Sequence, residues 1–547
     1  MMLSKNIFAG LTVGVIALPL SMALAIAVGV PPENGLYTAI IAGIIAAIFG
    51  SSKMNISGPT AAFVVILIPI VQEFGLSGLL VCGLMSGVLL VIMGAFKLGN
   101  LIELIPYPVT VGFTSGIAVV IAVFQIKDFF GLHIENFTGH FHQKVYTLLS
   151  SLPTFKLSEL IVGLSTLTIL ILWPKFKSKI PPALIALSVV TLGVYYFNAH
   201  TLGEQISTIA STFQYEIGDL KGNGIPPIPL QFTLPWSNFT LDDMSLDLFY
   251  KLLPHSVAIA ILGALESLLC AVITDGMTGY RTNPNKELIG QGLANLVVPF
   301  FGGIPATAAI ARSVVNIKSG ATSKLSSVVH SLFILASILL LAPYLSYMPM
   351  AGLSALLLVV AWNMSEVKHF RNIIKVAPKN DVYVLLVCFT LTVLLDMQIA
   401  VGVGMALASI LFIKRTIDLY SIELINTKEA SMHPDIPKNI AIYDINGPMF
   451  FGAAQNALKR LISIEEEINV VIINMENVTM MDMTALVAFQ SIIENFKSKN
   501  KKLVICGLKS RLLTKLNKSG VVFNDTDLIL EHNIHKAIKE YETPKES

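Results

Sequence analysis

Two ionisable residues, Glu266 and Arg312, stand within otherwise apolar stretches of this 547-residue sequence. Charged side chains at membrane depth are rare, and most of them face a cavity or a charged partner. The planar guanidinium of Arg312 could hold a carboxylate or a sulfate through two parallel hydrogen bonds. Because arginine side chains are long, the alternative is that Arg312 reaches the membrane surface, where Lys318 follows six residues later.

Glu266 shares its expected helical face with Leu262 and Cys270 and with no second carboxylate. A buried carboxyl group without a like-charged neighbour is either protonated or paired with a cation. Glu266 is therefore a candidate proton carrier or a partner for Arg312. The simpler alternative is that its hydrogen bond only fixes one helix to another.

A short motif occurs twice, each time directly before an apolar run: Ser57-Gly58-Pro59-Thr60-Ala61-Ala62 and Ile304-Pro305-Ala306-Thr307-Ala308-Ala309. In transporters built from inverted repeats, helices interrupted at matching places mark the substrate site. A helix that begins inside the membrane leaves free N–H groups and the positive end of its dipole there. Unless the small residues only permit close helix packing, we expect a substrate-binding site for an anion made of Gly58, Pro59, Thr60, Ala61, Ala306, Thr307, Ala308 and Arg312.

The composition indicates that the elements around these residues lie in a membrane. Only 13% of residues are charged and the mean hydropathy is +0.72, whereas about 25% are charged in soluble domains. Stretches without any charge cover 6–32, 34–52, 54–72, 74–96, 104–126, 180–203, 288–311 and 325–365. Together with shorter apolar runs at 160–174, 252–265, 382–395 and 397–413, they predict about 14 helical spans.

The loop charges predict the orientation. With both termini in the cytoplasm, sixteen Lys and Arg residues fall in inner loops and five in outer loops, which satisfies the positive-inside rule. We therefore expect a multi-pass protein of the cytoplasmic (inner) membrane. The four cysteines are well separated and suggest no disulfide framework.

The charge density rises near the C-terminus: residues 416–547 carry 15 Lys/Arg and 17 Asp/Glu, against 22 and 18 in residues 1–415. We predict a transmembrane domain over 1–415, a linker over 416–437 and a small α/β domain over 438–547. Alternating strands and helices support the α/β domain. The strands are expected at 440–446, 470–474 and 502–506, and the helices at 452–467, 482–498 and 510–519.

Several motifs resemble those of the SulP anion transporters. They are Phe8-Ala9-Gly10 through Ala17-Leu18-Pro19, Pro32 to Tyr37, Ser57 to Ala61, and Asn285 to Gly292. The tail, with Asn474-Met475 and Met481 to Leu486, resembles the STAS domain of that family. Within the family, the segments Glu266–Thr278, Ala306–Ser323 and Ala361–Glu366 are most similar to the bacterial C4-dicarboxylic acid transporter.

The resemblance implies a 7+7 inverted repeat of core and gate domains that works by an elevator-like movement, commonly as a homodimer. It places the substrate between the starts of spans 3 and 10, and it places the acid of span 8 on Glu266. Sodium-dependent bicarbonate members have Asp and Thr where this chain has Glu266 and Cys270. A thiol is a poor ligand for a hard cation, so proton coupling is favoured. Leu20 stands where many sulfate-type members have Gln, which weakens a sulfate assignment.

We therefore expect secondary active, proton-coupled uptake of C4-dicarboxylates such as succinate, fumarate or aspartate, with Glu266 carrying the proton. The alternative within the family is a sulfate or bicarbonate transporter or exchanger. A more remote alternative is a membrane-tethered regulatory scaffold whose STAS domain binds a cytosolic protein. No nucleophile–base pair, metal-ligand spacing or phosphate-binding loop occurs in the sequence. We therefore expect no enzymatic activity, no cofactor, no metal and no nucleic-acid partner.

Overall fold

The computed structural model describes residues 2–100, 106–134, 137, 139, 141–176, 178, 180–201, 204–217, 220–237, 239, 246–395, 397–418, 421–424, 439–450, 467–523 and 527–542. The chain forms two compact units, residues 1–406 and 407–547. The division falls inside one helix, α17 (Met397–Asp418).

The first unit is helical. Nine helices of the described residues are long and apolar enough to cross a membrane. In chain order, its principal helices begin with α1 (Met2–Val28), α2 (Pro32–Phe49), α3 (Ala61–Ala95), α4 (Tyr107–Phe124), α7 (Leu157–Leu172) and α8 (Pro182–His200). They continue with α10 (Leu246–Thr278), α11 (Pro284–Val297), α12 (Ile310–Lys318), α13 (Leu325–Leu345), α14 (Met350–Met364), α16 (Lys379–Leu394) and α17.

One glycine divides α3 into two arms. Gly75 has φ 67° and ψ −170°, a conformation that residues with a Cβ rarely adopt. If the two arms of α3 are counted separately and the connecting helices α5 (Ile126–Phe129), α6 (Phe141–Ser151), α9 (Ile209–Thr212) and α15 (Val367–Val376) are left out, seven helical segments of the described residues precede α10, and α10 begins a second set of seven. This arrangement matches the expected fold class. The first arm of α3 is the third segment of the first half, and α12 is the third segment of the second half.

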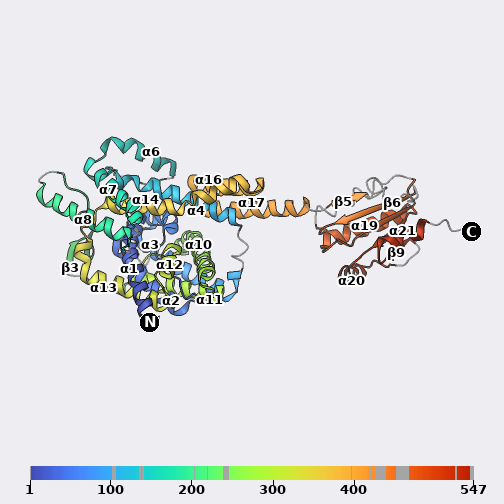
Figure 1. Ribbon diagram of the computed structural model, residues 1–547, viewed down its shortest axis with the longest axis horizontal. Coiled ribbons are helices and arrows are strands. Elements are labelled where there is room, and N and C mark those ends of the chain that lie inside the picture. Colours follow the sequence, from blue (N-terminus) through green and yellow to red (C-terminus); the bar gives the residue numbers. More distant parts are fainter. Residues whose placement is uncertain are drawn as a thin grey trace, which may run out of the picture. The chain divides into compact units, whose positions relative to one another are not determined.

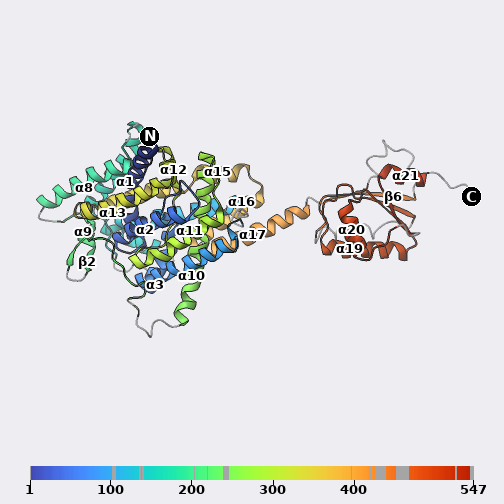
Figure 2. The same ribbon diagram turned by 90° about the horizontal axis from the view of Figure 1, so that it is seen from below.

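The helices pack as two groups (Figures 1 and 2). The core group, α1, α2, α3 and α10 to α13, is held by close contacts, such as those between α3 and α11. A Cβ on Gly87 would lie 2.7 Å from the Leu296 nitrogen, and one on Gly292 would lie 2.7 Å from the Val91 nitrogen. Small residues therefore let these two backbones approach each other. The gate group comprises α4, α7, α8, α14, α16 and α17.

Further elements connect the principal helices. They are α5, α6, α9, the hairpin β2 (Gln214–Ile217) with β3 (Leu220–Asn223), α15, and three 3₁₀ turns at Leu152–Thr154, Trp173–Phe176 and Val298–Phe301. Two further strands, β1 (Ser57–Gly58) and β4 (Thr307–Ala308), consist of two residues each.

The second unit contains a five-stranded sheet in the order β5-β6-β7-β8-β9. The strands are β5 (Ser421–Leu424), β6 (Ile440–Asn446), β7 (Val470–Asn474), β8 (Lys502–Cys506) and β9 (Leu528–Glu531), and the helices are α19 (Met483–Ser498), α20 (Ser510–Lys518) and α21 (Ile534–Glu542). The strands predicted at 440–446, 470–474 and 502–506 are confirmed. The helices predicted at 482–498 and 510–519 are also confirmed, each to within one residue at its ends.

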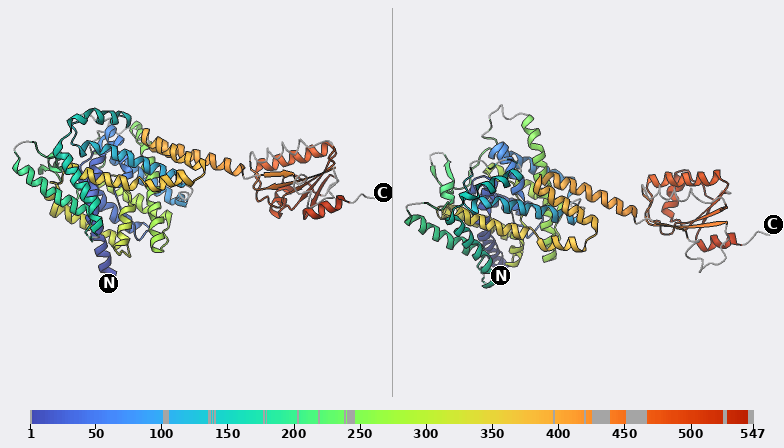
Figure 3. Two further views of the ribbon diagram at one scale, coloured as in Figure 1. Left: turned by 45° about the horizontal axis from the view of Figure 1, so that its top comes forward. Right: turned by 90° about the horizontal axis from the view of Figure 1, so that it is seen from above.

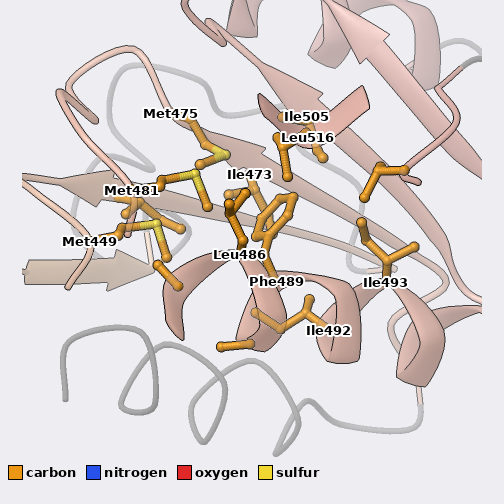
Figure 4. Close-up of a cluster of buried hydrophobic side chains, with 14 of the residues drawn as sticks. Met449, Ile473, Met475, Met481, Leu486, Phe489, Ile492, Ile493, Ile505 and Leu516 are labelled. Atoms are coloured by element: carbon orange, nitrogen blue, oxygen red, sulfur yellow. The ribbon is translucent and has the colours of Figure 1, made fainter. Parts of the chain in front are cut away.

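Helices cover both faces of this sheet (Figure 3). On one face Ile473 and Ile505 pack against Phe489 of α19 and Leu516 of α20 (Figure 4). On the other face Ile472 and Val504 pack against residues of α21. Successive side chains of β7 point to opposite faces of the sheet, and both faces are covered. This explains why the strand is apolar at every position but its last.

Ser421–Leu424 lies inside the expected linker, yet it forms β5 and pairs antiparallel with β6, so backbone pairing extends the sheet into that segment. The helix predicted at 452–467 lies outside the described residues except for its last position, Glu467.

Candidate anion-binding site

The two repeated motifs meet in space. Strands β1 and β4 pair antiparallel, with Ser57 opposite Ala308 and Gly58 opposite Thr307. A bond from the Ala309 nitrogen to the Ile56 oxygen (2.9 Å) extends the pair. Because the strands are antiparallel, the helices that follow them leave in opposite directions. The N-terminal ends of α3 and α12 therefore start from the same small sheet.

Neither helix is capped by a side chain of its own N-cap residue. Ala309, which precedes α12, has no side chain that could accept a hydrogen bond, and Thr60, which precedes α3, makes no capping bond. The Thr60 hydroxyl instead donates to Oε2 of Glu266 at 2.9 Å. The Phe63 nitrogen donates to the Thr60 carbonyl at 3.3 Å, and the remaining first-turn N–H groups of both helices are left for another partner. Helix N-termini favour anions.

Arg312 is the third residue of α12 and is buried, with 2% of its surface exposed. Its Nη2 donates to the Pro59 carbonyl, so the arginine of one motif binds the backbone of the other. Within the described part of the chain, Nε and Nη1 have no hydrogen-bond partner. Arg312 therefore does not extend to the membrane surface, and two of its donors remain available.

Glu266 lies on α10, which packs against α12 and β4. It interacts electrostatically with Arg312, but the two do not form an ion pair within 4 Å. The next residue on α10, Ser267, shares a hydrogen bond of 2.7 Å with Thr307, and the Thr307 hydroxyl also donates to the Gly263 carbonyl at 3.1 Å. These bonds fix α10 to the strand pair and place Glu266 beside the start of α3.

A cavity of about 290 Å³ opens at these helix ends between the core group and the gate group. Of the predicted site residues, Thr60, Ala61, Ala308, Arg312 and Glu266 line it. The other four lie behind its wall: Gly58 and Thr307 in the strand pair, Pro59 as the acceptor for Arg312, and Ala306 as a partner of Asn295. The structure thus brings both motifs to one place but separates cavity-lining residues from supporting ones.

Other lining residues were not predicted. The core group adds Leu20, Leu24, Ala62, Ala309, Ile310 and Ala311, and the gate group adds Thr114, Val360, Asn363 and Met364, followed by Glu366. In the sequence, only the family resemblance marks Leu20 and the segment 361–366. An apolar or neutral residue on a spanning helix carries no sequence signal of where it points, so the gate wall could not be identified from the sequence.

A buried polar network supports the strand pair from the other side. Glu287 of α11, 1% exposed, accepts hydrogen bonds from the backbone nitrogens of Ser51 and Ser52 (both 2.8 Å) and from the side chains of Asn55 (3.0 Å) and Gln291 (3.2 Å). Gln291 in turn donates to the Ser57 hydroxyl at 2.8 Å. The Asn285–Gly292 motif therefore fixes the segment that leads into β1.

Comparison with known proteins places the chain in a family. Residues 3–388 match the sulfate permease family and residues 431–537 match the STAS domain. A putative sulfate transporter of Bacillus subtilis is 40% identical over 94% of both chains. A bicarbonate transporter of Picosynechococcus is 29% identical over 94% of this chain and 90% of its own.

Solved structures agree on the fold. The structure of SLC26A9 matches 98% of this chain and 90% of its own, with a TM-score of 0.83 at 17% identity. The transmembrane domain of a cyanobacterial bicarbonate transporter matches 74% of this chain and 98% of its own, with a TM-score of 0.63 at 27% identity. The expected family and fold class are confirmed: this chain belongs to the sulfate permease family and is a multi-pass membrane anion transporter with a C-terminal STAS domain, not an enzyme.

Proposed function

We propose that this protein is a secondary active transporter of a small inorganic oxyanion, sulfate or bicarbonate, and that the anion binds in the 290 Å³ cavity. The observation that carries the proposal is the convergence of two uncapped helix N-termini with the free Nε and Nη1 donors of Arg312. Donors of this kind suit oxyanions. The names of the relatives from Bacillus subtilis and Picosynechococcus support these two substrates.

The transport step follows from where the cavity lies. Its walls come from both helix groups, so movement of the core group along the gate group would expose the cavity to one side of the membrane and then to the other. The anion would travel with Thr60, Arg312 and the helix ends, because these belong to the core group.

Proton-coupled uptake of C4-dicarboxylates is the second candidate. Leu20, Leu24 and Met364 form an apolar part of the cavity wall, which suits the methylene or vinyl carbons of succinate or fumarate better than it suits a sulfate. Glu266 would carry the proton, because it is the carboxylate that contacts the N-cap residue of α3. Cys270 lies one turn further along α10 and donates to Asn55 at 3.4 Å, so it belongs to the supporting network and is a poor ligand for Na⁺.

One reconstitution distinguishes these candidates. The purified full chain in liposomes is given labelled sulfate, bicarbonate or succinate, with an inward proton gradient, an inward Na⁺ gradient or neither. We expect saturable uptake of sulfate or bicarbonate. For whichever anion is transported, a proton-carrying Glu266 predicts faster uptake with the proton gradient, and Glu266→Gln should abolish that acceleration. Saturable uptake of succinate alone would establish the second candidate, and dependence on Na⁺ instead of protons would refute the role of Glu266.

The division of labour along the chain is also a proposal. Residues 1–415 would carry transport, 416–437 would connect, and the STAS domain at 438–547 would bind a cytosolic protein or regulate the transporter. We place the protein in the cytoplasmic membrane as a homodimer with both termini in the cytoplasm. Protease added to sealed inverted vesicles should then cleave the STAS domain, and right-side-out vesicles should protect it.

A further inference from the structure

The anion cavity contains a second carboxylate that the proposed function does not use. Glu366 lines the same cavity as Arg312 and Glu266, from the gate side. No ion-pair partner for it occurs among the residues that the structure describes. Glu366 is exposed to solvent, and an acidic side chain without an ion-pair partner in the wall of an anion site lowers the affinity of that site for anions.

The backbone at Glu366 is also unusual. Its φ of 42° and ψ of 40° are left-handed, a conformation in which a Cβ is crowded by the following carbonyl, so that Gly or Asn is preferred. Ser365 and Glu366 lie between α14 and α15, and two hydrogen bonds fix the backbone there. Ser115 of α4 donates to the Ser365 carbonyl at 2.7 Å, and the Phe370 nitrogen donates to the Glu366 carbonyl at 3.0 Å. Strained residues of this kind cluster at functional sites.

The charges around the cavity nearly cancel before any anion enters. Arg312 contributes one positive charge and the two helix ends about half a charge each, whereas Glu266 and Glu366 contribute two negative charges when both are ionised. On the gate side Glu366 interacts electrostatically with Tyr107, which forms a hydrogen bond of 3.0 Å with His369. Lys368 and Arg371 of α15 follow closely in the sequence, but among the described residues neither forms an ion pair with Glu366. A singly charged anion would leave the loaded cavity with about one negative charge, and a doubly charged anion would leave it with about two.

We propose that Glu366 is a charge filter: it disfavours a second negative charge in the cavity and so selects singly charged anions, bicarbonate over sulfate or a doubly ionised dicarboxylate. This inference rests on the proposed function, because it assumes that the anion binds at Arg312. It adds the charge of the preferred substrate, which the small uncharged residues of the wall do not determine.

The test first compares the uptake of labelled bicarbonate with that of labelled sulfate in proteoliposomes at pH 8. It then compares two tetrahedral oxyanions of similar shape, perchlorate with one charge and sulfate with two, as inhibitors of bicarbonate uptake. In the unmodified protein, kcat/KM should be higher for bicarbonate than for sulfate, and perchlorate should inhibit more strongly than sulfate. Glu366→Gln should strengthen sulfate binding about tenfold, the scale of a like-charge interaction in a solvated cavity. It should strengthen perchlorate binding only about threefold, because a Coulomb energy is proportional to the charge of the ligand.

Two further variants separate charge from backbone shape. Glu366→Asp keeps the charge and tolerates the left-handed backbone, so it should retain the preference for single charge. Asp381→Asn removes a carboxylate from the first turn of α16, outside the cavity lining, and should behave as the unmodified protein does. An unchanged sulfate-to-perchlorate ratio in Glu366→Gln, or a preference for sulfate in the unmodified protein, would overturn the charge filter. Absence of saturable uptake of any of these anions would instead refute the proposed function.

Discussion

Gly58 lies against the group that we expect to bind the anion, and replacing it should weaken binding without unfolding the protein. A Cβ on Gly58 would lie 2.6 Å from Nη1 of Arg312 and 3.3 Å from the Cα of Ala39. The Ala39 backbone belongs to α2 and cannot easily move. In Gly58→Ala the guanidinium should therefore shift, because it is the flexible end of a long side chain.

The magnitude follows from what Arg312 would lose. Displacement breaks its hydrogen bond to the Pro59 carbonyl and moves its free donors away from the cavity. A hydrogen bond to a charged group contributes about 1.5–3 kcal/mol, so we expect the KM for anion uptake to rise about 10- to 100-fold.

Proteoliposome uptake over a range of anion concentrations measures this KM. Gly276→Ala is the matched control, because Gly276 of α10 has no atom near the position of an added Cβ. Size-exclusion profiles and thermal unfolding should show that both variants remain folded. A Gly58→Ala protein that is folded and has the KM of the control would refute the proposed role of Arg312 in anion binding.

Three other predictions concern the surrounding structure. Glu287→Gln places an amide N–H where Oε1 or Oε2 now accepts hydrogen bonds. Thermal unfolding in detergent should therefore show that the free energy of unfolding falls by about 3 kcal/mol. The control Glu73→Gln, at an exposed position, should show no loss. Burial lowers the pKa of Lys144, which lies in α6 outside the spanning helices and donates to Gln72 at 3.3 Å. Its charge therefore opposes folding at neutral pH, and this effect fades as the pH rises toward the ordinary lysine value. Lys144→Met should stabilise the protein by about 1 kcal/mol at pH 7 and by less at pH 10. The control is Lys221→Met, which removes an exposed lysine and should give no such gain. An equal gain at both pH values in Lys144→Met, or the same gain in the control, would contradict this reasoning. Phe489→Ala should destabilise the STAS domain by about 3–5 kcal/mol, because Phe489 is fully buried, and Val487→Ala on the same helix, where Val487 is 51% exposed, should cost little.

The sequence predicts those features that depend on local chemistry. Uncharged runs indicate the spanning helices because unpaired charges are excluded from the membrane interior. Glu266 and Arg312 stand out for the same reason, and the structure brings them to one cavity with Thr60 and Ala308. In the second unit, β7 was predictable because a strand buried on both faces is apolar nearly throughout.

Features that depend on long-range packing were not predictable. The pairing of Gly58 with Thr307 joins segments nearly 250 residues apart, and two-residue strands have no periodicity to detect. Glu366 looked like one of many loop charges, since neither its left-handed backbone nor its place in the cavity wall is visible in the sequence. The strand β5 is short and lies beside residues typical of a linker, so only its pairing with β6 reveals it.

The central claim is that the anion binds at the N-terminal ends of α3 and α12, and substrate protection of a single cysteine tests it most directly. Ala311 lines the cavity in the first turn of α12 and is exposed, whereas the four native cysteines are buried. Ala311→Cys in proteoliposomes should react with a water-soluble maleimide, and saturating bicarbonate or sulfate should slow this reaction severalfold. The control Gly276→Cys should react at the same rate with and without anion. Equal labelling of Ala311→Cys with and without an anion that the same vesicles transport would contradict the account.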